Sequence, residues 1–212
     1  MFTGLIEKLG KLKIKSSKGE ILEIGIHVDD LNDIKIGDSI SCNGVCLTVT
    51  KIVKNIYYFE LMTETITKTL FKSLPLESLI NIERALTVDK RLDGHIVQGH
   101  IDTIGSIKNI ESKGLYHIFT FEYDKSFSHL VVPKGSISVD GISLTIINTS
   151  LTNFSVGVIP YTYNNTNFKE KKIGDKIHIE FDIIGKYLYR FFCQKDFRNK
   201  QETLFNEVLE KW

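Results

Sequence analysis

Two short polar motifs each place a pair of small hydroxyl or thiol groups on one face of a predicted strand. Thr48 follows Cys46 by two residues, and Thr145 follows Ser143 by the same spacing. Successive side chains of a strand point to opposite faces, so residues two apart share a face. Such pairs, set in an apolar background, suit the recognition of a flat heteroaromatic ring. They equally suit a hairpin whose hydroxyls satisfy local backbone groups.

Two histidines bracket the sequence Ile-Val-Gln-Gly near the middle of the chain. His95 and His100 are five residues apart, which fits neither the helical spacing of metal ligands nor a same-face pair on a strand. The sequence therefore predicts no metal site. An imidazole is suited to proton transfer near neutral pH, which makes His100 a candidate acid or base. A capping or core position is the alternative for both histidines.

The three cysteines are Cys42, Cys46 and Cys193. An odd and small number does not build a secreted disulfide framework, so we expect reduced thiols. Cys42 and Cys46 are too isolated for a zinc half-site. Cys46 is a candidate nucleophile, a candidate ring contact, or inert filler.

The elements that must position these groups occur twice, because the chain contains an internal repeat. Residues 39–49 align with residues 136–146 without a gap, with six identities in eleven positions. Chance would give about one, and so the match indicates a tandem duplication. The same offset aligns residues 80–83 with residues 177–180, and a slightly shorter offset aligns Gly4 with Gly99. A missing side chain at these glycines allows a ligand or backbone to approach closely.

The positions at which the copies differ are further candidates for chemistry. His100 stands where the first copy has Leu5, and Asp182 stands where it has Ala85. Ser143 replaces Cys46, which indicates that a small polarizable or hydroxylic group is needed there and weakens the filler interpretation.

Each copy has the pattern of a small all-β module. Short segments rich in Ile, Val, Thr, Phe and Tyr recur about every 8–12 residues, which is typical of antiparallel strands in a barrel or sandwich. Asn43-Gly44 and Asp140-Gly141 suit tight hairpin turns, because these residues tolerate positive φ. We expect a short helix at Thr63–Phe71 and another near Pro160–Phe168.

The predicted domains are residues 1–90, residues 91–185, and a C-terminal helix over residues 186–212, with a linker at Thr87–Gly94. The helix either packs on its own barrel or forms an oligomer interface. Its large apolar residues recur near helical spacing. They are Tyr187, Leu188, Phe191, Phe192, Leu204, Phe205, Val208 and Leu209.

Composition narrows the classes of partner. The 212 residues include 27 basic and 26 acidic side chains, and this balance gives no electrostatic footprint for nucleic acid. No basic leader precedes an apolar run, and no segment reaches the roughly 18 apolar residues of a membrane-spanning helix. We expect a soluble, cytoplasmic protein that binds neither nucleic acid nor membrane.

Four motifs together resemble one enzyme family. Met1–Gly4, Asn43–Thr48, Gly94–His100 and Asp140–Thr145, in this order and spacing, are similar to the riboflavin synthase alpha chain over essentially the whole sequence. The resemblance implies an all-β fold of tandem duplicated six-stranded antiparallel Greek-key β-barrels plus a C-terminal α-helix. It also implies a homotrimer and leaves an association with lumazine synthase open.

The reaction implied by the resemblance needs no cofactor. Two molecules of 6,7-dimethyl-8-ribityllumazine dismutate: one gives four carbons to the other, and the products are riboflavin and 5-amino-6-(D-ribitylamino)uracil. Two identical substrates call for two similar pockets, which a duplication provides. In the family, the productive site joins the first barrel of one chain to the second barrel of a neighbour, so that proximity supplies much of the rate.

The resemblance also implies the residues of the site. Substrate contacts of the first copy would come from Phe2, Gly4, Leu5, Ile6, Cys46, Leu47, Thr48, Glu60, Leu61, Met62, Thr63, Glu64 and Thr65. Those of the second copy would come from Gly99, His100, Ile101, Lys134, Ser143, Leu144, Thr145, Ile159, Pro160, Tyr161, Thr162 and Tyr163. Our hypothesis is that His100 assists proton transfer and Thr145 orients it. Ser39, Cys46 and Ser143 would stabilise or form the adduct, and Asp182 is a further catalytic candidate.

Two rival functions share the architecture. A non-catalytic lumazine- or flavin-binding protein of the same fold would hold the chromophore without converting it. The second copy keeps Gly99, His100, Ser143 and Thr145, which favours the enzyme. A flavin reductase would need a nicotinamide-binding domain, for which the chain has no room.

Overall fold

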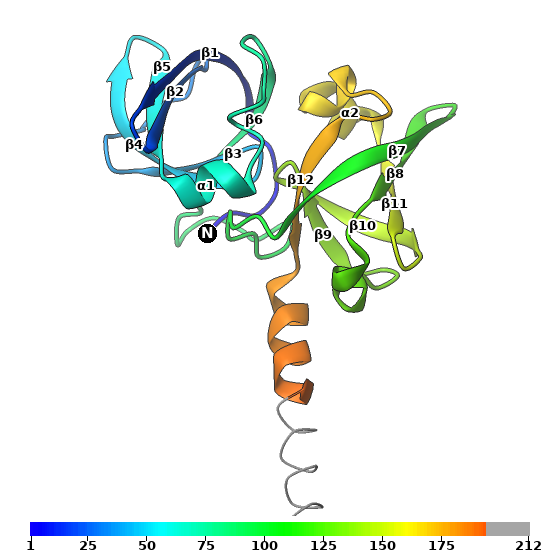
Figure 1. Ribbon diagram of the computed structural model, residues 1–212. Coiled ribbons are helices and arrows are strands. Elements are labelled where there is room, and N and C mark those ends of the chain that lie inside the picture. Colours follow the sequence, from blue (N-terminus) through cyan, green and yellow to red (C-terminus); the bar gives the residue numbers. More distant parts are fainter. Residues whose placement is uncertain (194–212) are drawn as a thin grey trace, which may run out of the picture.

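A computed structural model describes residues 1–193, and these form two closed six-stranded antiparallel barrels, seen side by side in Figure 1. The first barrel contains β1 (Lys8–Lys18), β2 (Ile21–His27), β3 (Ser39–Cys42), β4 (Val45–Val53), β5 (Ile56–Leu61) and β6 (Leu79–Arg84). The second contains β7 (Thr103–Lys113), β8 (Tyr116–Glu122), β9 (Ser136–Val139), β10 (Ile142–Thr149), β11 (Asn153–Val158) and β12 (Lys176–Phe181). The predicted fold class is confirmed.

Both barrels have the same Greek-key topology. Around the first barrel the order is β1-β2-β5-β4-β3-β6. The consecutive strands β3, β4 and β5 form a meander, and β2 lies beside β5 rather than beside β3, which is the Greek-key arrangement. The second barrel repeats this order with β7 to β12. Closure pairs every strand on both sides and leaves no open sheet edge in either barrel.

The two predicted helices are present but shorter than expected. They are α1 (Thr63–Lys68) and α2 (Pro160–Asn165), each of which follows the fifth strand of its barrel. The second barrel also has two 3₁₀ segments, η1 (Lys125–Leu130) and η2 (Asn167–Glu170). Pro160 begins α2, where its missing N–H costs no helical hydrogen bond.

The two predicted turns join matching strands. Asn43 and Gly44 have φ of +47° and +81°, and Asp140 and Gly141 have +46° and +81°. Two successive positive φ values are typical of the type I′ turn, whose twist matches that of a hairpin. These turns fix the register of β3 with β4 and of β9 with β10.

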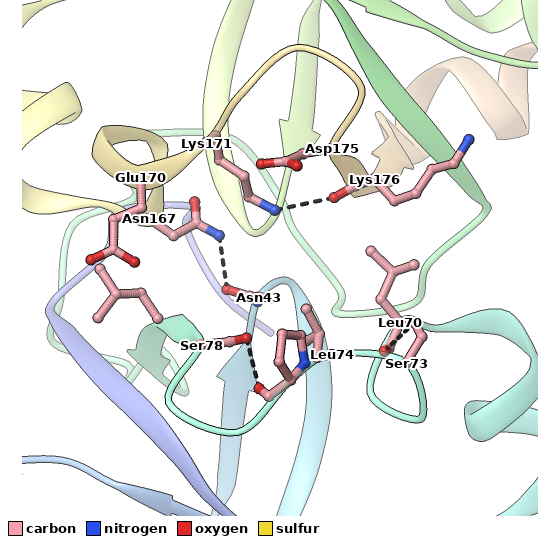
Figure 2. A pocket seen from close by; sticks show the side chains of 12 residues that line it. Asn43, Leu70, Ser73, Leu74, Ser78, Asn167, Glu170, Lys171, Asp175 and Lys176 are labelled. Atoms are coloured by element: carbon pink, nitrogen blue, oxygen red, sulfur yellow. Dashed lines mark hydrogen bonds between the residues drawn. The ribbon is translucent and has the colours of Figure 1, made fainter.

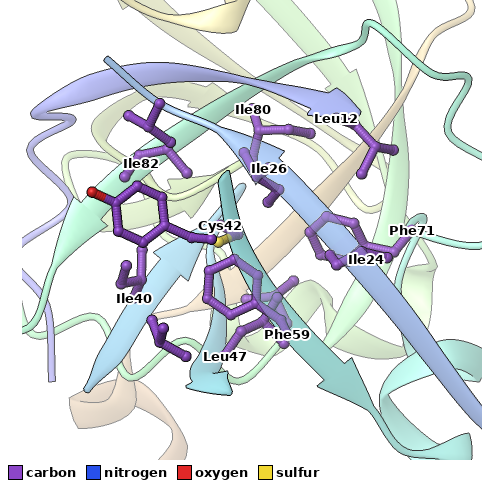
Figure 3. Close-up of a cluster of buried hydrophobic side chains, with 14 of the residues drawn as sticks. Leu12, Ile24, Ile26, Ile40, Cys42, Leu47, Phe59, Phe71, Ile80 and Ile82 are labelled. Carbon is purple, nitrogen blue, oxygen red and sulfur yellow. The ribbon is translucent and has the colours of Figure 1, made fainter. Parts of the chain in front are cut away.

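Each barrel encloses its own apolar core. In the first barrel, mainly aliphatic side chains surround Phe59 and Phe71 (Figure 3). The second core is more aromatic, and Phe119 stacks on Phe168 with ring centroids 4.9 Å apart. Burial of these side chains is the main force that holds each barrel closed.

A helix begins at residue 183 and continues to residue 193, the last described residue. Figure 1 shows it leaving the barrels rather than lying on them. Tyr187 and Phe191 are 72% and 64% exposed, so these aromatic residues are not covered by their own barrel. The predicted apolar positions Leu204, Phe205, Val208 and Leu209 lie outside the described residues. Within residues 1–193, no helix is both long and apolar enough to cross a membrane.

Phe168→Ala should destabilise the protein by about 3–5 kcal/mol, because it opens a cavity in the aromatic core of the second barrel. Tyr161→Ala is the matched control, because Tyr161 is 74% exposed and its removal should change stability by about 0.5 kcal/mol or less. Chemical denaturation measures both. Equal effects would contradict the assignment of Phe168 to the core.

Candidate functional site

Two chain segments cross between the barrels and pair with each other. The N-terminal arm, residues 1–6, precedes β1, and the second arm, residues 95–101, precedes β7. The Phe2 N–H donates to the Val97 carbonyl at 2.7 Å, and the Val97 N–H donates back at 3.1 Å. Phe2 and Val97 are equivalent positions of the repeat, so this pairing lies on the local twofold axis that relates the two copies.

A buried carboxylate holds each arm. Glu83 of β6 accepts the backbone N–H groups of Thr3 and Gly4 at 2.6 and 2.9 Å. Its counterpart, Glu180 of β12, accepts those of Gly99 and His100 at 2.9 and 3.1 Å. Burial raises the pKa of both carboxyls, and the hydrogen bonds from the arms oppose this rise. Each arm is therefore fixed mainly through its backbone, and the Thr3 hydroxyl adds a further hydrogen bond to Glu83.

Each arm lies against a hairpin of the other copy. The Ser143 N–H donates to the Gly4 carbonyl at 2.8 Å, and the Cys46 N–H donates to the Gly99 carbonyl at 2.9 Å. Both glycines have positive φ, +78° and +85°. A Cβ on Gly4 would lie 2.5 Å from Cβ of Ser143, and a Cβ on Gly99 would lie 2.5 Å from Cβ of Cys46. Only glycine fits both requirements.

This exchange of arms corrects the expected grouping of the site residues. The family resemblance groups residues 4–6 with Cys46 and residues 99–101 with Ser143. In the structure, Ile101 packs against the core of the first barrel, and Ile6 packs against that of the second. Each site is therefore built from both copies.

Site one combines residues 46–48 of β4 with residues 99–101 of the second arm. Leu47 is buried, Cys46 is half-buried, and Thr48 and His100 are exposed. The predicted segment Glu60–Thr65 runs from the end of β5, which is paired with β4, into α1. Ser39 pairs with Thr48 across β3 and β4.

Site two combines residues 143–145 of β10 with Leu5 and Ile6 of the N-terminal arm. Leu144 is buried and Thr145 is exposed, as at the matching positions of site one. The predicted segment Ile159–Tyr163 runs from the end of β11, which is paired with β10, into α2. The two sites thus share a frame and differ mainly in their polar groups.

His95 belongs to site two. Its Nδ1 lies 2.7 Å from Oγ of Ser143, and only 8% of the residue is exposed. Burial lowers the pKa of His95, while the charge of Asp182 opposes that shift. A neutral imidazole at this distance is able to polarise the serine hydroxyl. Sequence reasoning favoured a capping or core position for His95. The repeat gave no signal, because the segments that align between the two copies do not include His95.

Three other predicted residues have places that constrain their roles. Phe2, which was predicted as a substrate contact, is fully buried, and its backbone pairs the two arms. Asp182 accepts the Ile184 N–H at 3.0 Å and thereby caps the C-terminal helix. Lys134 is exposed before β9, and its N–H donates to the carbonyl of Ile146 at 2.8 Å.

Two cavities lie near these elements. One, of about 500 Å³, borders Leu5 and Ile6 and is also lined by Lys90 and Arg91 of the linker. The other, of about 290 Å³, lies between the barrels and includes Asn43 and neither Cys46 nor Ser143 (Figure 2). The first has the size of a small-molecule pocket and adjoins site two. Among residues 1–193, no cluster of three or more His, Cys, Asp or Glu could hold a metal ion.

Comparison with known proteins finds the same duplication. The family model of the lumazine binding domain matches residues 3–85 and again residues 98–182. The chain is 39% identical to riboflavin synthase of Bacillus subtilis, with 100% of this chain and 99% of the relative covered. It is 37% identical to riboflavin synthase of Actinobacillus pleuropneumoniae, with the same coverage.

A solved structure shares the fold. The crystal structure of LumP complexed with riboflavin superimposes with a TM-score of 0.80 at 22% identity, covering 85% of this chain and 99% of that chain.

Two closed barrels with exchanged arms, matched twice by one domain family, define a protein with a duplicated lumazine-binding domain. Identity of 31–39% to curated relatives over the whole chain places it more narrowly. The chain belongs to the riboflavin synthase family.

Gly99→Ala should destabilise the protein and weaken ligand binding at site one. Positive φ costs alanine about 1–2 kcal/mol, and the contact with Cys46 should add about 1–3 kcal/mol. Gly19→Ala separates the two effects, because Gly19 has φ of +62° with nothing within 4 Å of an added Cβ. Denaturation and ligand titration measure the difference. Equal losses in the two variants would contradict the close approach of the arm.

Proposed function

We propose that the protein catalyses the dismutation of two molecules of 6,7-dimethyl-8-ribityllumazine into riboflavin and 5-amino-6-(D-ribitylamino)uracil. The observation that carries the proposal is the pair of matching composite sites on a frame that belongs, over its whole length, to the riboflavin synthase family. A reaction between two copies of one substrate needs two similar binding sites, and the geometry supports this requirement.

The conserved parts of the two sites support ring binding. At each site a buried leucine, Leu47 or Leu144, stands beside an exposed threonine and a half-buried Cys46 or Ser143. An apolar surface with a few fixed polar groups suits a flat heteroaromatic ring. The positive-φ glycine of each arm brings its backbone against the same strand.

The differences between the sites support a division of roles. Site one carries His100, which follows Gly99 and whose N–H is bound by Glu180. Its imidazole is a candidate to accept a proton from the C7 methyl group of one lumazine. Site two carries Ser143 hydrogen-bonded to His95, a candidate to stabilise the adduct at C7 of the other lumazine. Cys46, Ser39 and Thr145 would assist at their respective sites.

Assembly and location are part of the proposal. The family resemblance and the exposed aromatic residues of the helix at residues 183–193 support a homotrimer, in which site one of a chain would face site two of a neighbour. Sedimentation equilibrium measures the mass of the assembly. Three free cysteines support a cytoplasmic location. An association with lumazine synthase is tested by co-purification of the two proteins.

Incubation of the purified protein with 6,7-dimethyl-8-ribityllumazine should yield one riboflavin for every two molecules of substrate consumed. Chromatography of both products measures this ratio, and no added cofactor is needed. Tight binding of the lumazine without conversion would support the chromophore-carrier function instead. If the protein neither binds nor converts the lumazine, both proposed functions are contradicted.

His100→Ala should lower kcat by about 10²–10⁴-fold, the usual contribution of a general acid or base, while the substrate still binds. His27→Ala is the control, because His27 lies at the end of β2 beside Asp29 and belongs to neither arm. Steady-state kinetics and equilibrium titration separate turnover from binding. Unchanged turnover in His100→Ala would remove His100 from the mechanism.

A further inference from the structure

A network of buried polar side chains joins the two barrels, and it is built twice around the local twofold axis. On one side, the Asn81 amide donates from Nδ2 to the Asp140 carbonyl at 2.9 Å. Its Oδ1 accepts the Asn167 N–H at 2.7 Å. Asn81 belongs to the first barrel and both partners belong to the second, so each of these hydrogen bonds crosses the interface.

The other side repeats this pattern with a different side chain. His178 is the equivalent of Asn81 in the repeat, and both residues are completely buried. The His178 Nδ1 lies 2.9 Å from the Asn43 carbonyl. Its Nε2 accepts the Leu70 N–H at 2.8 Å. Asn43 and Leu70 are the equivalents of Asp140 and Asn167. The Nδ1 and Nε2 atoms of His178 therefore correspond to the Nδ2 and Oδ1 atoms of Asn81.

These partners fix the protonation state of His178. A carbonyl only accepts, so Nδ1 must carry a proton; a backbone N–H only donates, so Nε2 must carry none. The ring is therefore neutral. A proton on Nε2 would point two donors at each other across 2.8 Å, and the imidazole would have to leave the backbone of Leu70. An asparagine cannot undergo this change.

The charged groups that face His178 do not replace the lost hydrogen bond. The Asp140 Oδ1 lies 3.6 Å from Nδ1, and the Asp140 Oδ2 is already paired with Lys171 at 3.0 Å. Phe71 packs beside the ring, with centroids 6.0 Å apart. Burial lowers the pKa of His178 below its ordinary value; Asp140 opposes this shift and Lys171 adds to it. The carboxylate therefore favours the imidazolium but offers no acceptor at Nε2.

The network is close to both composite sites along the chain. Asn43 and Asp140 occupy the two hairpin turns, three residues before Cys46 and Ser143 respectively. The turns themselves touch, because a Cβ on Gly44 would lie 2.7 Å from the Gly141 backbone nitrogen. Any loss of register between the barrels would therefore shift each hairpin against the arm of the other copy.

We propose that neutral His178 is a positioning residue that holds the two barrels in register, and that its protonation loosens the interface and with it both composite sites. The hydrogen bonds that Asn81 of the first barrel makes across the interface are insensitive to pH. The hydrogen bond that His178 of the second barrel accepts from Leu70 is lost when acid protonates the imidazole. The cavity between the barrels, lined by Asn43, Leu70 and Asn167, gives solvent a route to this interface (Figure 2).

The direction of the pH effect follows from linkage. The ordinary pKa of histidine is 6.5, and that of folded His178 lies lower. Below about pH 6.5 the unfolded chain binds a proton that the folded chain resists, so stability is lost as the pH falls. His95 contributes in the same sense, and Asp140 does so at lower pH. The raised pKa values of Glu83 and Glu180 act in the opposite sense.

The test compares the wild-type protein with His178→Asn, because every other titrating group is common to both. The variant copies the Asn81 side of the network, so it should fold and keep binding riboflavin. Between pH 6.5 and pH 5.5, the unfolding constant of the wild type should rise by up to about fivefold more than that of the variant. Its affinity for riboflavin should also fall more steeply. Parallel profiles would overturn the proposal.

Two further measurements keep the proposal testable if His178→Asn does not fold. In the wild type, the ¹⁵N spectrum of His178 should show the neutral ring with the proton on Nδ1 at pH 7; an imidazolium or a proton on Nε2 would overturn it. Asn81→His should place a second acid-sensitive imidazole in the interface and make stability fall more steeply as the pH falls. Neither reading depends on turnover, so a failure of the proposed activity remains distinguishable from a failure of this inference.

Discussion

The close approach of each arm to the hairpin of the other copy is the constraint on which the rest of the structure depends. Gly4 and Gly99 permit backbone contact with Ser143 and Cys46, and any side chain there would collide with a Cβ atom. Glu83 and Glu180 hold the arms at this distance, although burial of a carboxylate is itself costly. Because these contacts are between copies, the barrels share both binding sites.

Local twofold symmetry makes the two candidate sites alike, and its exceptions indicate where they differ. Leucine and threonine recur at both sites, as expected for two identical ligands. His100 belongs to the second arm, which lies against Cys46 at site one, whereas His95 contacts Ser143 at site two. The same contrast occurs in the buried interface, where His178 replaces the symmetry-related Asn81. The two copies thus share one fold but differ in their ionisable groups at equivalent or neighbouring positions.

The sequence predicted the fold well because its signals were local. The repeat, the glycine-containing turns and the alternating strands all depend on neighbouring residues, and the Greek-key barrels came from the family resemblance. The exchange of arms could not be predicted, because a repeat shows which residues are equivalent but not which copy they touch. Phe2 was predicted to contact the substrate, yet it is fully buried where its backbone pairs with Val97. His95 had no partner in the repeat to indicate its role.

A crystal structure of the protein with bound riboflavin tests the composite sites most directly. In site one, we expect the ring to contact residues 46–48 and the second arm at residues 99–101 of the same chain. In site two, we expect contacts with residues 143–145 and with Leu5 and Ile6. A ring that contacts Cys46 and Leu5 together, with the second arm remote from it, would contradict the account.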